Sequence, residues 1–424
     1  MEACSNKVPD LTNSIVCVVG AGFVGLPLAN AFAKKMKVVT YDIDHVNIAR
    51  LKKNNDNPNH IFTTDPKTIA TADFICICVP TVINKSKEPD MSYVQSATTV
   101  IGKHLKRGAT VILESSVYPG ATQELVKPII EKESGYTCGV DFKLAYSPER
   151  INPGDNEHNV DKITKIVAAD DDETLELVAH LYMMITPNVF KAKNIRTAEA
   201  AKLIENIQRD VNIALVNEIS IILEKMNLNT KDVIDAAATK WNFQRYYPGM
   251  VGGYCIPVVP YFFTHKLEEY GYHSRIILAG RSINDDMPKY VAEMAVKSLN
   301  KAGKVIMNSK ILIMGLSYKA NVIDFRESPV KTLIAELKEY GIDIWGYTTE
   351  SEAAQKVFDI KLINNLSCSQ CFDCVIVTVA HDEFKATKLN ELKGIMNPQP
   401  ILIDLPGLFD TDEAYKKGFI YKRL

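Results

Sequence analysis

Short apolar runs separated by helical patterns dominate the first part of the chain. A buried strand reads as a nearly continuous apolar run, whereas a covering helix repeats its apolar residues about every 3.6 positions. On that basis we predict a helix over 26–35 and strands over 15–19, 37–41, 74–79, 110–113 and 142–145. Strands and helices that alternate in this way indicate a parallel, doubly wound sheet.

The middle of the chain changes to one long helical pattern. Residues 197–226 contain neither proline nor glycine, and their apolar residues recur at helical spacing: Leu203, Ile207, Val211, Ala214, Leu215, Ile219, Ile222 and Leu223. So long a helix needs apolar surface to cover it, so it is predicted to be a spine or a dimer interface. Shorter helices are predicted over 231–239 and 260–270.

The last third returns to the α/β pattern, with a helix over 329–340 and strands over 310–315, 342–345, 374–380 and 401–405. The predicted fold class is therefore α/β: two Rossmann-like, doubly wound domains joined by a long central helix and a small helical domain. The corresponding domain boundaries are 1–195, 196–300 and 301–424.

Composition and charge exclude several functions. The 49 Lys and Arg nearly balance the 51 Asp and Glu, and the net charge of −2 excludes a polycation. We therefore expect binding neither to nucleic acid nor to a membrane surface. The nine cysteines are odd in number and scattered, which favours reduced thiols in the cytoplasm over a disulfide framework.

A glycine-rich turn follows the first predicted strand. Residues 15–33 are apolar enough to be mistaken for a signal peptide or a membrane span, but Gly20, Gly22 and Gly25 interrupt them. The pattern GxGxxG between a strand and a helix is typical of a dinucleotide-binding turn, with the pyrophosphate at the helix N-terminus. Asp42 lies 22 residues after Gly20, where its carboxylate accepts from ribose hydroxyls and repels a 2′-phosphate, so NAD is favoured over NADP. The alternative is an ordinary βαβ turn.

A cysteine in a shaped loop is a candidate nucleophile. Cys255 has Gly252 and Gly253 before it and Pro257 after it, a setting typical of a loop rather than a helix interior. A thiol on such a loop can attack an aldehyde. The alternative is a small apolar core residue, which is the commonest fate of a lone cysteine.

Two polar clusters are candidates for the remaining chemistry. Lys202 and Asn206 lie four residues apart on the long helix, hence on one face, with Glu205 between them. A cation and an amide placed in this way can hold an oxyanion, and the alternative is a solvated stripe. Glu149 follows the strand over 142–145, where α/β sheets place their chemistry, and its alternative is a helix cap or turn.

Clustered cysteines near the C-terminus do not indicate a metal. Cys368, Cys371 and Cys374 have two overlapping CxxC spacings, with His381 as a further candidate ligand. A zinc site needs about four ligands, and no second paired cluster lies nearby, so no metal is expected.

Five stretches in order along the chain resemble the family of NAD-dependent UDP-glucose and GDP-mannose dehydrogenases. They are YSPERINPG (146–154), AKLIENIQRDVNIALVNE (201–218), TKWNF (239–243), LAGRSIND (278–285) and GLSYKANVIDFRES (315–328). The likeness runs from about residue 15 to about residue 410, and it is strongest to members that act on UDP-N-acetylhexosamines.

The resemblance implies a reaction and the residues that perform it. In this family the C6 alcohol of a nucleotide sugar is oxidised to a carboxylate with two NAD per sugar. Cys255 then corresponds to the nucleophile that captures the aldehyde, and Glu149 to the residue that assists water in hydrolysis. Lys202 and Asn206 correspond to the pair that stabilises the oxyanion. The product would be a uronate for surface polysaccharide or glycan precursors.

The same resemblance implies the binding residues. Cofactor contacts are expected at Gly20, Gly22, Phe23, Val24, Gly25, Asp42, Pro80, Thr81, Ser116, Lys319 and Arg326. Substrate contacts are expected at Arg150, Lys202, Asn206, Arg245, Tyr247, Gly252, Arg281, Lys319 and Asp324. Residues 1–195 would bind NAD, 196–300 would form the central helical dimerisation domain with the cysteine loop, and 301–424 would bind the UDP-sugar. The chain would form a homodimer through its central helix.

The chain departs from the family pattern at five positions. The aspartate four residues after the nucleophile is Val259, and the histidine before the nucleophile is Tyr254. Ser116 replaces a threonine, Tyr247 an arginine and Pro406 a lysine. Loss of the carboxylate at position 259 predicts slower thiol chemistry or slower hydrolysis.

Three functions follow from this sequence. The favoured one is a UDP-N-acetylhexosamine 6-dehydrogenase, with UDP-N-acetylglucosamine ahead of UDP-N-acetylgalactosamine. The second is a catalytically impaired homologue that binds sugar nucleotides. The third is a dehydrogenase of the 2-hydroxy-acid or phosphogluconate type, which shares the Rossmann half and the long helix but needs no nucleophilic cysteine.

Overall fold

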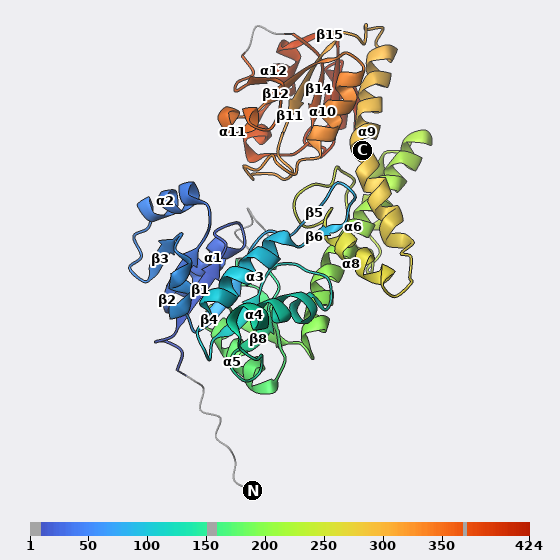
Figure 1. Cartoon of the computed structure of the whole chain (residues 1–424). Helices are drawn as coiled ribbons and strands as arrows, with labels where there is room; N and C mark the ends of the chain where they lie inside the picture. The colour runs from blue at the N-terminus through green and yellow to red at the C-terminus, as the bar shows by residue number, and fades with distance from the viewer. Residues whose placement is uncertain (1–9, 151–158, 368–370) are drawn as a thin grey trace. The chain divides into compact units, whose positions relative to one another are not determined.

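The chain forms two compact units in the computed structural model, which describes residues 10–150, 159–367 and 371–424 (Figure 1). The first unit contains the residues up to Asn206 together with Val258–His273. The second contains Ile207–Pro257 and Ser274–Leu424. The long helix α6 (Ile195–Lys225) begins in the first unit and continues into the second. Among the described residues, no helix combines the length and the apolarity needed to cross a membrane.

The first unit is built on an eight-stranded sheet in the order β10-β9-β8-β7-β4-β1-β2-β3. Neighbouring strands are parallel except β8 and β9, which run antiparallel. The strands are β1 (Ile15–Val19), β2 (Lys37–Tyr41), β3 (His60–Thr63), β4 (Phe74–Ile77), β7 (Thr110–Leu113), β8 (Lys143–Tyr146), β9 (Thr164–Ala169) and β10 (Asn188–Lys191). The longer helices that accompany them are α1 (Gly25–Ala33), α2 (His45–Lys53), α3 (Ser92–His104), α4 (Lys127–Ser134) and α5 (Asp172–Met183).

Burial on both faces explains why the strands of this sheet read as apolar runs. Val16 and Val18 of β1 are completely buried, and they share one core cluster with Leu28 and Phe32 of α1 and with Tyr182 of α5. The strands are therefore covered by helices and do not face solvent, as is typical of a parallel sheet. The antiparallel edge formed with β9 was not predicted.

The second unit carries a six-stranded sheet that is parallel throughout, in the order β13-β12-β11-β14-β15-β16. Its strands are β11 (Lys310–Met314), β12 (Asp343–Tyr347), β13 (Lys361–Ile363), β14 (Phe372–Val377), β15 (Met396–Asp404) and β16 (Ile420–Lys422). Its helices include α10 (Val330–Glu339), α11 (Ser351–Gln355), α12 (Leu389–Gly394) and α13 (Thr411–Lys416). The predicted fold class, with two Rossmann-like sheets, is confirmed.

Both sheets reverse their strand order at the same relative place. The chain leaves β1 toward β2 and β3 and then returns to add β4 on the other side, and it does the same around β11 with β12, β13 and β14. In doubly wound sheets such a reversal opens a crevice at the carboxyl ends of the strands, where ligands bind. Each unit therefore has one such edge.

Two long helices dominate the middle of the chain. The structure confirms the predicted helix as α6 and the shorter ones as α7 (Thr230–Ala237) and α8 (Val259–Glu268). A second long helix, α9 (Ile276–Lys301), was not predicted. It contains Gly280, which packs against Val211 and Ala214 of α6, and Pro288 in its interior.

Free thiols are distributed over both units. The described cysteines Cys17, Cys76, Cys78, Cys138, Cys255, Cys371 and Cys374 are all unbridged. Burial raises the pKa of the Cys17 thiol to about 12, and the same cause raises that of Cys138 to about 11. These two thiols are therefore poor nucleophiles near neutral pH. Cys368, part of the clustered cysteines, lies outside the described residues.

Candidate active site

The glycine-rich turn between β1 and α1 leaves room for an anion at its centre. Gly20 has φ +105°, and a Cβ there would lie 2.7 Å from the carbonyl oxygen of Cys78. A Cβ on Gly25 would lie only 1.9 Å from the carbonyl oxygen of Gly20, so neither position admits a side chain. A Cβ on Gly22, in contrast, would meet no atom within 4 Å. The turn is tight at both ends and open at Gly22, which fits the approach of a pyrophosphate.

The first turn of α1 presents its backbone to this opening. Val24 is the N-cap residue, and its side chain makes no hydrogen bond to the amides of the helix. Phe23 is 47% exposed beside it. Because amides at a helix N-terminus attract anions, Phe23 and Val24 remain candidates for contact with the cofactor.

Asp42 follows β2, and its carboxylate holds the glycine-rich turn in place. Oδ2 accepts a hydrogen bond from the Ala21 amide at 2.6 Å, and Oδ1 accepts one from the Asp44 amide at 2.9 Å. A carboxylate oxygen has more than one lone pair, so Asp42 can accept from ribose hydroxyls while it supports the turn. The residues present therefore fit a dinucleotide with a free 2′-hydroxyl.

The strand ends beside the turn carry the other predicted cofactor contacts. Pro80 and Thr81 follow β4, and Ser116 follows β7, the next strand in the sheet. Pro80 is exposed, and Thr81 and Ser116 are half-buried. The hydroxyl of Ser115 donates to the Val79 carbonyl at 2.7 Å and ties the two strand ends together. All three candidates thus lie at the carboxyl edge of one sheet.

Glu199 fastens the loop after β7 to α6, and sequence reasoning missed it. Its completely buried carboxylate accepts from the Gly120 amide at 2.5 Å and from the amide and hydroxyl of Thr122 at 2.9 and 2.5 Å. The only signal in the sequence is an acidic residue three positions before Lys202 on a helix. Glu199 is a buried structural anchor for the segment that follows Ser116.

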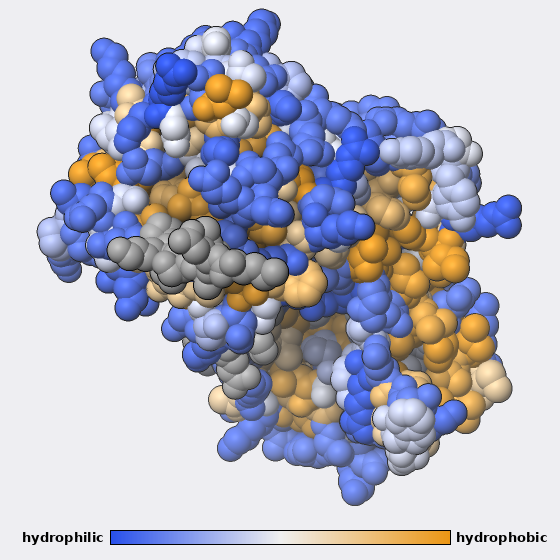
Figure 2. Space-filling view, turned by 90° about the horizontal axis from the view of Figure 1, so that it is seen from below, coloured by the Kyte–Doolittle hydropathy of each residue, from blue (hydrophilic) through white to orange (hydrophobic). Residues whose placement is uncertain are grey.

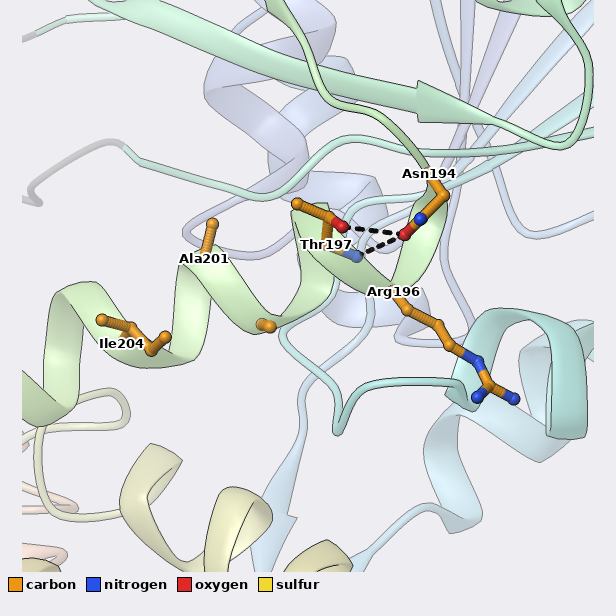
Figure 3. Close-up of a pocket in the computed structure, with 6 residues that line it drawn as sticks. Asn194, Arg196, Thr197, Ala201 and Ile204 are labelled. Atoms are coloured by element: carbon orange, nitrogen blue, oxygen red, sulfur yellow. Dashed lines mark hydrogen bonds between the residues drawn. The ribbon is translucent and has the colours of Figure 1, made fainter.

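The start of α6 is well defined. Asn194 caps the helix by accepting from the amide of Thr197 at 2.8 Å and from its hydroxyl at 2.9 Å (Figure 3). Arg196 points away from these two residues and pairs with Glu124 at 2.7 Å. These contacts fix the first turn of the helix that carries the predicted oxyanion pair further along.

Glu149 lies after β8, and the next residue, Arg150, links this segment to α6. It is 7% exposed, and its Oε1 accepts from the Arg150 amide at 2.6 Å. The Arg150 guanidinium pairs with Glu205 of α6 at 2.8 Å. Since Glu205 lies between Lys202 and Asn206, these contacts gather three of the four predicted catalytic residues in the first unit. The remainder of that stretch, 151–154, lies outside the described residues.

Lys202 and Asn206 are buried and one helical turn apart. Each is 8% exposed. The Asn206 side-chain nitrogen has no hydrogen-bond partner within the described parts of the chain, and the same holds for the hydroxyls of Tyr146 and Ser147 at the end of β8. Buried donors without a partner are rare in folded proteins. This arrangement is suited to receiving an oxygen-bearing ligand.

Cys255 belongs to the second unit and is exposed. Two glycines seat its loop: a Cβ on Gly252 would lie 2.5 Å from the ring of Pro329, and one on Gly253 would lie 2.8 Å from the ring of Tyr318. The Gly253 amide donates to the Glu327 carbonyl at 2.9 Å. The cysteine loop therefore lies directly against the segment that carries Lys319, Asp324 and Arg326.

The segment opposite the cysteine holds a strong ion pair. The guanidinium of Arg326 donates to both oxygens of Asp324, at 3.1 and 2.8 Å. Burial alone would raise the pKa of Asp324, but these hydrogen bonds more than offset it and hold the pKa below its usual value. The guanidinium also lies 5.5 Å from the ring centre of Tyr254, beside the nucleophile. Arg326 keeps much of its side chain exposed and able to meet a ligand.

His381 anchors the same segment from a loop after β14. Its Nδ1 accepts from the Asn321 amide at 3.0 Å, and its Nε2 lies 3.0 Å from the hydroxyl of Ser317. Ser317 in turn donates to the carbonyl of Lys319 at 2.8 Å. An Nδ1 that accepts leaves the proton on Nε2, so the neutral tautomer is set by its surroundings. The position of Lys319 is thus tied to His381.

Of three further predicted substrate contacts in the second unit, two arginines form ion pairs and one tyrosine is exposed. Arg245 pairs with Asp235 at 3.3 Å and is half exposed. Arg281 is 1% exposed and forms ion pairs with Asp210 and Asp285, so its guanidinium is held by the fold of this unit. Tyr247 is 50% exposed. Their contacts with substrate stay predictions.

Val259 begins α8 in the first unit and is 2% exposed. The side chain that replaces the family aspartate is therefore buried and apolar. It supplies neither charge nor hydrogen bond to a nearby lysine or water.

The doubly wound sheet and the open glycine-rich turn define a dehydrogenase of the nucleotide-dependent class. Three family models match the chain in succession: the NAD binding domain of the UDP-glucose/GDP-mannose dehydrogenase family at residues 14–186, its central domain at 196–286 and its UDP binding domain at 312–411. The chain belongs to the UDP-glucose/GDP-mannose dehydrogenase family. The resemblance stated from the sequence and the expected cofactor, NAD, are both confirmed.

Relatives of known name span nearly the whole chain. Protein CapL of Staphylococcus aureus is 42% identical over 415 residues, which cover 95% of this chain and 97% of CapL. The UDP-N-acetyl-D-glucosamine 6-dehydrogenase of Pseudomonas aeruginosa is 42% identical, with 94% and 98% covered. Among solved structures, the UDP-D-ManNAc dehydrogenase of Pyrococcus horikoshii aligns with a TM-score of 0.87 at 27% identity, covering 96% of this chain and 98% of its own.

Proposed function

We propose that this chain is a UDP-N-acetylhexosamine 6-dehydrogenase that oxidises the C6 alcohol of its substrate to a carboxylate. UDP-N-acetylglucosamine is favoured because two relatives named for that sugar are 42% and 38% identical, against 30% for relatives named for UDP-N-acetyl-D-mannosamine. The observation that carries the proposal is the buried Lys202–Asn206 pair, on the helix to which Glu149 is tied; among the described residues its amide nitrogen has no hydrogen-bond partner.

The first unit would bind the cofactor and supply the base. Gly22 and the first amides of α1 would face the pyrophosphate, and Asp42 would accept from the adenosine ribose. Bound NAD supplies the acceptor for the two electrons and hydrogen removed from C6 in each oxidation. Glu149 would remove a proton from the water that hydrolyses the last intermediate.

Cys255 would hold the sugar between the two oxidations. Its sulfur adds to C6 of the aldehyde, and the thiol proton passes to the oxygen, which gives a thiohemiacetal. Oxidation of that carbon gives a thioester. Water attacks the thioester and loses one proton to Glu149. The C–S bond then breaks, the second proton of the water passes to the departing sulfur, and the carboxylate leaves with Cys255 as its thiol. Lys202 and Asn206 would stabilise the negative oxygen formed in the attack.

The central helix would join two copies of the chain in a homodimer. In its second-unit part, Leu215 and Ile222 lie seven residues apart on one face and are 53% and 50% exposed, and Met226, directly after the helix, is 60% exposed. Apolar residues that share one helix face support burial against a partner. Apolar side chains also reach the molecular surface in the view of Figure 2.

The free cysteines favour the cytoplasm, where the uronate would serve polysaccharide or glycan synthesis.

A second candidate function is a sugar-nucleotide-binding homologue with impaired turnover. It is favoured by the apolar, buried side chain at Val259 in place of the family aspartate. On this alternative the chain would still bind NAD and UDP-sugar, but an intermediate would not be released from Cys255.

The test is NADH release counted per sugar consumed, with UDP-N-acetylglucosamine, UDP-N-acetylgalactosamine, UDP-N-acetylmannosamine and UDP-glucose. Two NADH per sugar support the proposed function and identify the substrate. One NADH, or a burst that stops, supports the impaired homologue. No NADH from protein that binds NAD contradicts the dehydrogenase. Activity on a 2-hydroxy acid that survives Cys255→Ala would indicate the third class.

A further inference from the structure

An ion pair is completely buried beneath the segment that carries Glu149. Lys165 of β9 is 1% exposed and Glu114, after β7, is 0% exposed, and their charged atoms lie 2.6 Å apart. Two buried charges lose their hydration, and an ion pair in such a place is seldom more stable than apolar packing. We therefore looked to this pair for a role other than stability.

The pair reaches the Glu149 segment by direct contact. Besides Glu114, the Lys165 ammonium donates to the carbonyl of Pro148 at 3.0 Å, the residue before Glu149. The hydroxyl of Tyr182, on α5, donates to the second oxygen of Glu114. The Lys165 nitrogen lies 5.1 Å from the centre of the Tyr182 ring. One cation thus connects strand β9, the end of β7, helix α5 and the peptide that leads into Glu149.

The charges in this cluster do not cancel. Lys165 acts on both Glu114 and Glu149, and the two carboxylates repel each other. Tyr146, Tyr182 and the thiols of Cys76 and Cys78 also face the cluster, and burial keeps them neutral by raising the pKa of each well above its usual value. Arg150, whose amide donates to Glu149, has its guanidinium paired with Glu205. Burial would lower the pKa of Lys165, but the two carboxylates more than offset it.

We propose that Lys165 is a positioning residue for Glu149, holding the Pro148–Glu149 peptide through its carbonyl and placing its positive charge within electrostatic range of the Glu149 carboxylate. Glu114 and Tyr182 hold Lys165 in turn. The inference rests on the proposed function, in which ionised Glu149 takes a proton from water. A nearby opposite charge typically shifts a carboxyl titration by about 1–3 pH units. Removal of the Lys165 charge should therefore move the pH dependence of the hydrolysis step.

The decisive measurement is the pH dependence of uronate formation in Lys165→Met and Lys165→Arg, with the first burst of NADH recorded separately. In Lys165→Met we expect a burst near that of the parent, a hydrolysis rate at least about tenfold lower, and a half-maximal pH at least about one unit higher. Lys165→Arg keeps the charge and should restore most of the parent profile. The matched control is Lys304→Met, which removes a lysine paired with Asp373 in the second unit and should leave the profile unchanged.

Glu114→Gln tests the inference in the opposite direction and does not depend on the folding of a Lys165 variant. Gln keeps a hydrogen-bonding group but removes the negative charge that competes for Lys165, so the half-maximal pH should fall. A structural role alone predicts a lower melting temperature and an unmoved pH profile. An unmoved profile in folded Lys165→Met, or a rise in Glu114→Gln, would overturn the inference.

Failure of the proposed function gives a different result, because the parent chain itself would then form no uronate. In that case the ionisation of Glu149 is followed without turnover, by the infrared carboxyl band that disappears in Glu149→Gln. The titration of this band should move up in Lys165→Met and down in Glu114→Gln. A band that titrates identically in all three backgrounds overturns the role of Lys165.

Discussion

The contrast between Gly22 and Gly25 allows the cofactor turn to be tested separately from the fold. The perturbation is the same at both positions, one added methyl group. At Gly22 the new Cβ meets no atom within 4 Å and the backbone φ is not positive, so the turn keeps its shape. At Gly25 the Cβ would lie 1.9 Å from a carbonyl oxygen, whereas real Cβ atoms essentially never come closer than 3.0 Å. The strand or the helix must therefore move by about 1 Å.

These distances set opposite expectations for stability and binding. Gly22→Ala should leave stability unchanged or raise it by about 0.4–1 kcal/mol, because the unfolded chain loses freedom. It should weaken NAD binding by about 10- to 150-fold, since the methyl group displaces one hydrogen bond to a charged phosphate, about 1.5–3 kcal/mol. Gly25→Ala should cost about 1–3 kcal/mol of stability or more, through overpacking.

The assay is thermal denaturation of each variant together with calorimetric titration of NAD. Gly394→Ala is the matched control, because the Cβ at this position in α12 also meets no atom within 4 Å and lies in the other unit. It should leave NAD affinity unchanged and, like Gly22→Ala, keep the stability or raise it by about 0.4–1 kcal/mol. Parent-like NAD affinity in Gly22→Ala would refute the placement of the pyrophosphate over this turn. A parent-like melting temperature in Gly25→Ala would refute the close packing of β1 and α1.

The remaining predictions concern the site and its pH dependence. Asn206→Ala removes a buried donor that has no partner among the residues the structure describes, so stability should hold while turnover falls by about 10²–10³-fold; a steady-state assay beside a thermal melt checks both. Val259→Asp buries a carboxylate and should lower the melting temperature, yet raise uronate release after the first NADH; slower release in a folded variant would contradict this. Burial lowers the pKa of His60 to about 4. The unfolded side chain binds a proton near pH 6.5, so the free energy of unfolding should fall as the pH drops from about 6.5 toward 4. Denaturant titration of His60→Gln should show a smaller loss over that window.

The sequence carried enough information for both sheets because their strands are buried on two faces. The runs at Ile15–Val19 and Lys310–Met314 are apolar and end in glycine, and both are strands in the structure. Helix α9 escaped prediction because Gly280 and Pro288 lie within it, and both residues usually indicate breaks. Both residues are accommodated inside the helix by its packing in the folded protein, and the local sequence pattern does not contain that information.

The candidate site divides in the same way. Lys202 and Asn206 could be placed on one face from spacing alone, but spacing left a solvated stripe open as the alternative. The structure buries both residues on α6. The surroundings of Arg281 could not be predicted, since its partner Asp210 lies 71 positions away in the chain. Lys165 and Glu114 were missed for a related reason. A single charge inside a strand pattern looks exposed until the opposite charge is brought to it by the fold.

The cysteine loop is held at two closely spaced points. Asn217 of α6 holds both the amide and the carbonyl of Gly249, at 2.8 and 3.1 Å, as a neighbouring strand would. The next fixed point is the Gly253 amide on the carbonyl of Glu327. Only three residues lie between these two anchors, and an extended chain gains at most about 3.3–3.6 Å per residue. The sulfur two residues further on is therefore carried by the Tyr318–Glu327 segment, and an engineer who wishes to move it should redesign that segment rather than lengthen the loop.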